Sequence, residues 1–197
     1  MFKQGLWYAS ITVDCVPDRV QTVGGAVGLD FGIQSAVAFS NGTIIDNPGF
    51  LKQSQVKVNR LAKKSRNKRA PNHKKRIRPS RRWKKANRAV AKVQSKVARQ
   101  RQDWQHKVAA EIVSCNSFVA TEKLNLRGLT KKAKKKSKRK KQKTGLNRNL
   151  LDVGIGNLKS LVKYKVSEVG GIYFEIPTRK NLFLDINFES KRWCCKM

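Results

Sequence analysis

Acidic residues are scarce in this 197-residue chain, which has 12 Asp and Glu against 45 Lys and Arg and a formal net charge of +33. An ordinary globular surface does not need such an imbalance, so it indicates a polyanionic partner. Nucleic acid is the first candidate, because every neutralised phosphate releases condensed counterions. An anionic membrane surface is the alternative that the net charge alone leaves open.

Long apolar runs and paired cysteines are also missing. No apolar run approaches the roughly 18 residues that span a bilayer, and the first ten residues lack the apolar core of a signal peptide. We therefore expect neither an integral membrane protein nor a secreted one. The four cysteines form no C-x-x-C motif, which argues against a disulfide scaffold and a zinc ribbon and fits a reducing cytosol.

A chain of this length can bury one core with a small accessory piece. Two β-rich runs, Val27–Ile33 and Ser35–Phe39, are joined around a Gly-x-Asp-x-Gly sequence. They predict a strand that carries Asp30, a turn and a pairing strand. The Asn-Gly dipeptide at positions 41–42 predicts a hairpin turn into a third antiparallel strand at residues 43–45.

Asp30 needs a physical explanation, because a lone acid in an apolar strand is costly unless a cation or a donor neutralises it. The flanking glycines Gly28 and Gly32 would let a ligand approach the backbone closely. The alternative is a hairpin whose Asp caps its own turn. A second acid, Glu122, ends the apolar strand predicted over Ser117–Glu122. If the two strands are neighbours, the paired acids beside a basic surface would suit Mg²⁺ and phosphodiester cleavage.

The middle of the chain is basic and helical. We expect a short helix over Lys52–Lys64, a loop interrupted by Pro71 and Pro79, and a long helix over residues 81–114. One stripe of the long helix is apolar, which favours a core position for Trp104 over a role in base stacking. The stripe comprises Ala86, Val90, Val93, Val97, Trp104, Val108 and Ile112.

Two basic regions are candidates for nucleic-acid contact, the basic face of residues 52–107 and the block Lys131–Lys143. The second holds almost nothing apolar, so it should be disordered without its partner. The candidate nucleic-acid-binding residues are Lys63, Lys64, Arg66, Lys68, Arg69, Lys74, Lys75, Arg76, Arg81, Arg82, Lys84, Lys85, Lys134, Lys135 and Lys136.

The remaining segments complete an α/β pattern. Residues 5–16 are β-branched and aromatic and predict a strand near the N-terminus. Leu150–Val166 predicts one amphipathic helix despite two glycines, and Ile172–Ile176 predicts a strand closed by Pro177. A helix that feeds a strand, twice in succession, is typical of a layered α/β fold.

Six stretches, in this order and spacing, resemble the RuvC-like nuclease domain of the TnpB proteins. These proteins are also called the OrfB transposase family of bacterial insertion sequences and are related to the type V CRISPR effectors. The resemblance covers roughly residues 5–180. Its motifs are Val27–Gly32, Arg101–Lys107, Ala120–Leu126, Leu151–Gly154, Leu161–Lys165 and Gly170–Pro177.

The resemblance implies an α/β, RNase H-like mixed sheet with flanking helices and a long basic helical insertion at about 52–115. Residues 1–20 would be a remnant strand of an N-terminal nucleic-acid-binding domain, 21–180 the nuclease domain and 181–197 a divergent tail. Asp30 and Glu122 would be the first two metal-binding acids, for Mg²⁺. Asp185, in an Asp-Ile-Asn context, imitates the third catalytic acid of the family.

The resemblance further implies DNA and a guide RNA as partners, with target choice made by base pairing, and a bacterial, nucleoid-associated location in the cytoplasm. The family's zinc ribbon has no counterpart among the cysteines here. We therefore expect a chain truncated at both ends, an incomplete nuclease with weak or no cleavage. The alternative is a non-catalytic basic DNA- or RNA-binding module, and the oligomeric state stays open.

Overall fold

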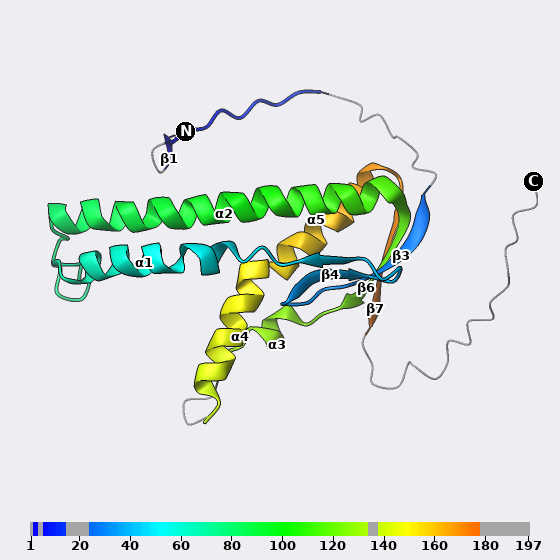
Figure 1. Ribbon diagram of the computed structural model, residues 1–197. Helices are drawn as coiled ribbons and strands as arrows, with labels where there is room; N and C mark the ends of the chain where they lie inside the picture. Colours follow the sequence, from blue (N-terminus) through cyan, green and yellow to red (C-terminus); the bar gives the residue numbers. More distant parts are fainter. Residues whose placement is uncertain (1, 4–5, 15–23, 134–137, 178–197) are drawn as a thin grey trace, which may run out of the picture.

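The computed structural model describes residues 2–3, 6–14, 24–133 and 138–177, and a five-stranded mixed sheet forms its centre (Figure 1). The strands run in the order β5-β4-β3-β6-β7 across the sheet. β3 pairs antiparallel with β4 and β4 with β5, whereas β6 is parallel to β3 and β7 is parallel to β6. The five strands are β3 (Gly25–Asp30), β4 (Ser35–Phe39), β5 (Ile44–Asp46), β6 (Asn116–Lys123) and β7 (Ile172–Pro177).

The antiparallel meander confirms the prediction from the two β-rich runs and the Asn-Gly turn. Between β4 and β5, Gly42 takes a φ of 86°, a conformation that costs glycine little. The Asn41 side chain accepts a hydrogen bond from the Thr43 backbone N–H at 2.9 Å. Local turn chemistry therefore fixes the register of β4 and β5.

Two long helices confirm the helical prediction for the basic middle of the chain. α1 (Phe50–Arg66) lies against the first half of α2 (Arg81–Cys115), and this helical pair extends away from the sheet (Figure 1). Ser80 begins α2 by accepting a hydrogen bond from the Trp83 backbone N–H at 3.1 Å, as serine commonly does at this position. The shorter helices are α3 (Leu126–Leu129), α4 (Lys140–Val153) and α5 (Ile155–Glu168).

The hydrophobic core lies between one face of the sheet and the helices α2 and α5. Val27, Leu29 and Val119 of the sheet are buried against helix residues that include Ile112 and Leu158. Trp104 is partly buried and packs against the same core, which confirms the expectation that its ring serves packing.

The strand predicted over residues 5–16 is wrong for most of its length. Among the described residues of this range, 6–14, only β2 (Leu6–Trp7) is a strand, paired antiparallel with β1 (Phe2–Lys3), and residues 8–14 have no strand structure. Ile11 and Val13 are largely exposed. Alternating apolar residues favour a strand only where a neighbouring strand and a core accept them, and this segment has neither among the described residues.

The helix predicted over Leu150–Val166 is instead two helices. Gly154 separates α4 from α5 and takes a left-handed φ of 67°, a conformation that ends a helix at little cost for glycine. The prediction of a disordered block over residues 131–143 is wrong for Lys140–Lys143, which form the start of α4. Lys134, Lys135, Lys136 and the predicted tail 181–197 with Asp185 lie outside the described residues.

Candidate functional site

Asp30 and Glu122 lie on neighbouring parallel strands, as the proposal of a shared site requires. Leu29 of β3 is the register partner of Thr121 of β6, so the two acids occupy the next position on each strand. Neighbouring strands lie about 4.8 Å apart. The two acids are 92 positions apart in the sequence but only one strand apart at the carboxyl edge of the sheet.

The two acids also share a face of the sheet. Leu29 and Thr121 are both buried toward the helices. Because side chains alternate along a strand, Asp30 and Glu122 both belong to the opposite face, and both are exposed. A carboxylate pair in this arrangement can be reached by a large substrate.

The donor set fits a hard divalent cation in part. Neither carboxylate makes a hydrogen bond or an ion pair within the described part of the chain, so both keep their oxygen lone pairs available. Mg²⁺ is commonly held by one or two carboxylates together with water and substrate phosphate. Among the described residues, no third acid, histidine or cysteine joins the pair to form a larger metal-binding cluster.

Lys159 supports the strand that carries Glu122, a role that the sequence did not suggest. Its side chain is about 10% exposed, and its Nζ donates a hydrogen bond to the main-chain carbonyl of Glu122 and lies 3.6 Å from Glu175 Oε1. Tyr173 extends this network, because its hydroxyl lies 3.1 Å from Thr121 Oγ1 and donates to Glu175 Oε1 at 3.3 Å. Burial, and secondarily the charge of Glu175, raises the pKa of the Tyr173 hydroxyl above its ordinary value of 10.0.

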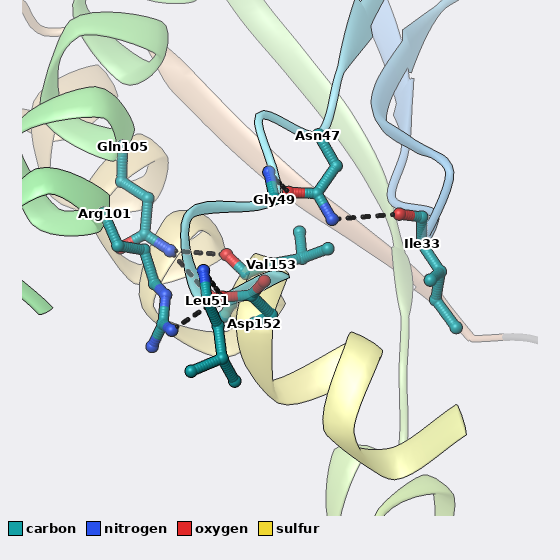
Figure 2. Close-up of polar contacts among 9 residues, drawn as sticks. Ile33, Asn47, Gly49, Leu51, Arg101, Gln105, Asp152 and Val153 are labelled. Carbon is teal, nitrogen blue, oxygen red and sulfur yellow. Dashed lines mark hydrogen bonds and ion pairs between the residues drawn. The ribbon is translucent and has the colours of Figure 1, made fainter. Parts of the chain in front are cut away.

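A second polar cluster joins the helices at the side of the sheet (Figure 2). The buried Asp152 Oδ1, near the end of α4, accepts hydrogen bonds from Arg101 Nη2 at 2.8 Å and from the Leu51 backbone N–H at 3.3 Å. α1 begins at Gly49 without a side-chain cap of its own. Asp152 therefore supplies the capping oxygen from 101 positions further along the chain.

Gln105 fixes the junction of α4 and α5 in the same cluster. Its Nε2 donates to the carbonyl oxygens of Val153 at 2.7 Å and Gly154 at 3.2 Å (Figure 2). A Cβ at position 154 would lie 2.7 Å from this Nε2, so the site requires glycine for space as well as for its φ. Arg101, Gln105 and Asp152 all fall within motifs of the resemblance, which the sequence alone did not connect to one another.

The predicted nucleic-acid-binding residues that the structure describes gather on one extension. We call residues 50–100 the basic arm; they form α1, the following loop and the first part of α2, and they hold 20 Lys and Arg and no acid. Lys68 is half-buried, and the other predicted residues of the arm are exposed. They are Lys63, Lys64, Arg66, Lys68, Arg69, Lys74, Lys75, Arg76, Arg81, Arg82, Lys84 and Lys85.

The face of the sheet that carries the acids also exposes apolar side chains. Ile172 and Phe174 of β7 are 61% and 54% exposed, and Phe118 and Ile176 are exposed to a smaller degree. Ile176 is the register partner of Glu122. The acids thus lie at the edge of an apolar surface, and the charges of the arm lie on another part of the molecule.

The chain combines a mixed α/β fold, acids at adjacent strand ends and a basic helical arm. A family model named OrfB_IS605 and described as "Probable transposase" matches residues 10–133, which is more than half of the chain. The chain belongs to this transposase family. The match includes Asp30, the basic arm and Glu122.

Two curated proteins are similar to nearly the whole chain. "Putative RNA-guided DNA endonuclease InsQ" of Escherichia coli (strain K12) is 27% identical over 178 residues, which cover 88% of this chain and 42% of the relative. "Putative RNA-guided DNA endonuclease" of Streptomyces pristinaespiralis is 29% identical over 199 aligned positions, which cover 98% of this chain and 41% of the relative. The chain therefore spans about two fifths of the length of these relatives.

The helices give no sign of a membrane-spanning element. Within the described residues, none is both long and apolar enough to cross a bilayer.

Proposed function

We propose that this chain carries the nuclease centre of an RNA-guided DNA endonuclease, in a domain of RNase H-like, RuvC-like fold over residues 21–180. The observation that carries the proposal is the placement of Asp30 and Glu122 at the adjoining carboxyl ends of two parallel strands. The strand order, with an antiparallel meander followed by two parallel strands, supports the assignment of the fold. The names of the two relatives supply the substrate class, DNA cleaved under the direction of an RNA.

Asp30 and Glu122 would hold Mg²⁺ through their carboxylate oxygens. When bound, the metal supplies Lewis-acid polarisation of the phosphodiester and a more acidic water. The chain's own contribution is positional: β3 and β6 hold the two carboxylates one strand apart, and Lys159 fixes the backbone at Glu122. Asp185 remains a prediction as a third acid.

The basic arm would bind the nucleic-acid backbone. Of its 20 cations all but the half-buried Lys68 are exposed, and the same stretch holds no acid. Contact with phosphates would therefore release counterions and give affinity with little sequence preference. Sequence choice would then come from pairing between guide RNA and target strand.

The test measures metal binding and cleavage separately. We expect Mn²⁺, used as a spectroscopic substitute for Mg²⁺, to bind the wild-type chain, and Asp30→Ala and Glu122→Ala each to weaken that binding about tenfold or more, because each removes one of two ligands. Asp46→Ala is the matched control, since Asp46 is an exposed acid at the end of β5 in the same sheet. In a nicking assay on single-stranded DNA, each lost acid should lower any rate by orders of magnitude.

The alternative function, a non-catalytic nucleic-acid-binding module, is favoured by the separation of the basic arm from the acids. It predicts DNA binding that falls steeply with salt and is unaffected by Asp30→Ala. It also predicts that the wild-type chain binds Mn²⁺ no more tightly than Asp30→Ala does. Specific metal binding that depends on both Asp30 and Glu122 would instead exclude this alternative.

A further inference from the structure

A cavity of about 770 Å³ lies between the N-terminus of α1, the middle of α2 and α4, and its lining includes neither Asp30 nor Glu122. Its volume is within the range of roughly 300–1,000 Å³ that small-molecule sites occupy. The lining combines apolar side chains, Leu51 and Leu151, with basic ones, Lys140 and Arg148. The acid in the lining, Asp152, is already paired with Arg101, so the free charge of the cavity is positive.

The basic and apolar groups come largely from one face of α4. Lys140, Thr144, Asn147, Arg148 and Leu151 all line the cavity, and their spacings of three, four, seven and eight place them on the same side of a helix. α4 is held in place by Asn147, whose Nδ2 donates to the Thr130 carbonyl at 2.9 Å. The cavity is therefore built on a fixed helix.

Two polar atoms in the lining residues lack partners. Arg101 Nε, a donor, and Asn147 Oδ1, an acceptor, are buried and form no hydrogen bond within the described part of the chain. Native structures seldom leave buried polar atoms unpaired. A ligand that offers both acceptor oxygens and a donor would suit this lining better than an ion alone, after small shifts of these two side chains.

We propose that this cavity binds one nucleotide of a single-stranded nucleic acid. Arg148 and Lys140 would contact the phosphate, and Leu151 and Leu51 would contact the face of the base. The apolar wall disfavours a bare phosphate ion, and the cations disfavour an apolar ligand. A single strand is required because a base paired in a duplex cannot leave the stack without cost.

This inference rests on the proposed function in one respect, that the chain binds nucleic acid. It adds a contact with a base in a cavity that the carboxylates do not line, which neither the basic arm nor the metal centre would provide. The basic arm contributes affinity through phosphates alone, whereas this cavity would make the affinity depend on a base as well.

The test compares variants of exposed residues on α4 in the full chain. A fluorescent oligothymidylate of about eight nucleotides is titrated against wild type, Arg148→Ala and Leu151→Ala. Lys141→Ala and Leu146→Ala are matched controls, because both residues are exposed on the same helix and neither lines the cavity. We expect the cavity variants each to lose about five- to tenfold in affinity, and the controls to stay within about twofold of wild type. Thermal unfolding of each variant checks that the fold is retained.

An abasic strand separates contact with the base from contact with the phosphate. Leu151→Ala should not weaken binding of an abasic strand of the same length, whereas Arg148→Ala should weaken it and reduce the slope of log affinity against log salt by about 0.7. Cavity variants that bind oligothymidylate as the controls do would overturn the inference while leaving the proposed function standing. So would a Leu151→Ala effect that persists on the abasic strand. Wild-type chain that binds no oligonucleotide would contradict both.

Discussion

The two parts of α2 differ from each other in charge and in burial. Residues 81–100 carry eight Lys and Arg and no acid, whereas residues 101–115 carry two basic and two acidic residues. In the first part only Val90 and Val97 are buried; in the second, Gln105, Val108, Ala109, Ile112 and Val113 are buried. One continuous helix thus changes from a charged support of the basic arm into a wall of the hydrophobic core.

The difference indicates that stability depends mainly on one part of α2 and nucleic-acid affinity on the other. Burial of apolar area stabilises the part that crosses the sheet, and helix–helix contact with α1 is what holds the other part. Substitutions that separate the two properties test this division directly.

The largest effect should come from truncating the core part. Ile112→Ala removes a side chain that is 1% exposed and should lower the free energy of unfolding by about 3–4 kcal/mol, because it leaves a cavity among packed neighbours. Val90→Ala, in the arm part, should cost only about 1 kcal/mol. Urea unfolding measures both. Equal costs would mean that the arm is packed as firmly as the core.

Removal of the contact by which α4 holds α1 and α2 should have the next largest effect. Asp152→Ala deletes the partner of Arg101 and the cap of α1 and should cost about 2–3 kcal/mol, since bonds to a charged group contribute about 1.5–3 kcal/mol. Faster amide hydrogen exchange in α1 should accompany the loss. Asp152→Asn, which keeps an acceptor oxygen, should recover part of the stability; a full loss in this variant would assign the effect to charge alone.

Neutralising the arm should change affinity and leave stability nearly unchanged. The combined variant Arg81→Ala, Arg82→Ala, Lys84→Ala and Lys85→Ala removes four exposed charges. It should weaken duplex DNA binding about ten- to a hundredfold near 0.1 M salt and reduce the salt slope by about 3–4. Lys107→Ala, in the core part and already ion-paired with Asp103, should change binding little. A substantial fall in unfolding temperature in the fourfold variant would contradict the division.

The smallest effect should be a pH dependence confined to the sheet. Because the pKa of Tyr173 is raised in the folded state, the folded chain holds the phenol proton more tightly than the unfolded chain does. The resulting stability is fully present below pH 10 and is lost as the pH rises above 10 through the folded pKa. The free energy of unfolding of the wild type should therefore fall relative to that of Tyr173→Phe only above pH 10. Below pH 10 the difference between the two should not change with pH. A difference that varies with pH below 9 would implicate another group.

Much of the sheet could be predicted because its signals are local. The Gly-x-Asp-x-Gly sequence, the Asn41-Gly42 turn and the apolar stripe of α2 each act over a few residues, and the strands and helices that they predict are present. The sequence left open whether the Asp30 and Glu122 strands are neighbours, and the structure shows that they pair in parallel.

The polar clusters could not be predicted, because they depend on partners remote in sequence. Nothing local to Asp152 indicates Leu51 or Arg101, and nothing local to Lys159 indicates the carbonyl of Glu122. The end of α4 at Gly154 was missed for a related reason. Glycine within an amphipathic pattern is compatible with a continuous helix, and contact with Gln105 is what favours the left-handed turn.

The cap of α1 by Asp152 has a consequence for the order of events during synthesis. Leu51 leaves the ribosome 101 residues before its hydrogen-bond partner does, and contacts so distant in sequence form late because their loop must close first. The two helices of the arm can pair with each other early, but α1 obtains its capping oxygen only when α4 has emerged. A nascent chain that has reached residue 115 thus presents a highly cationic hairpin before the core that anchors it is complete.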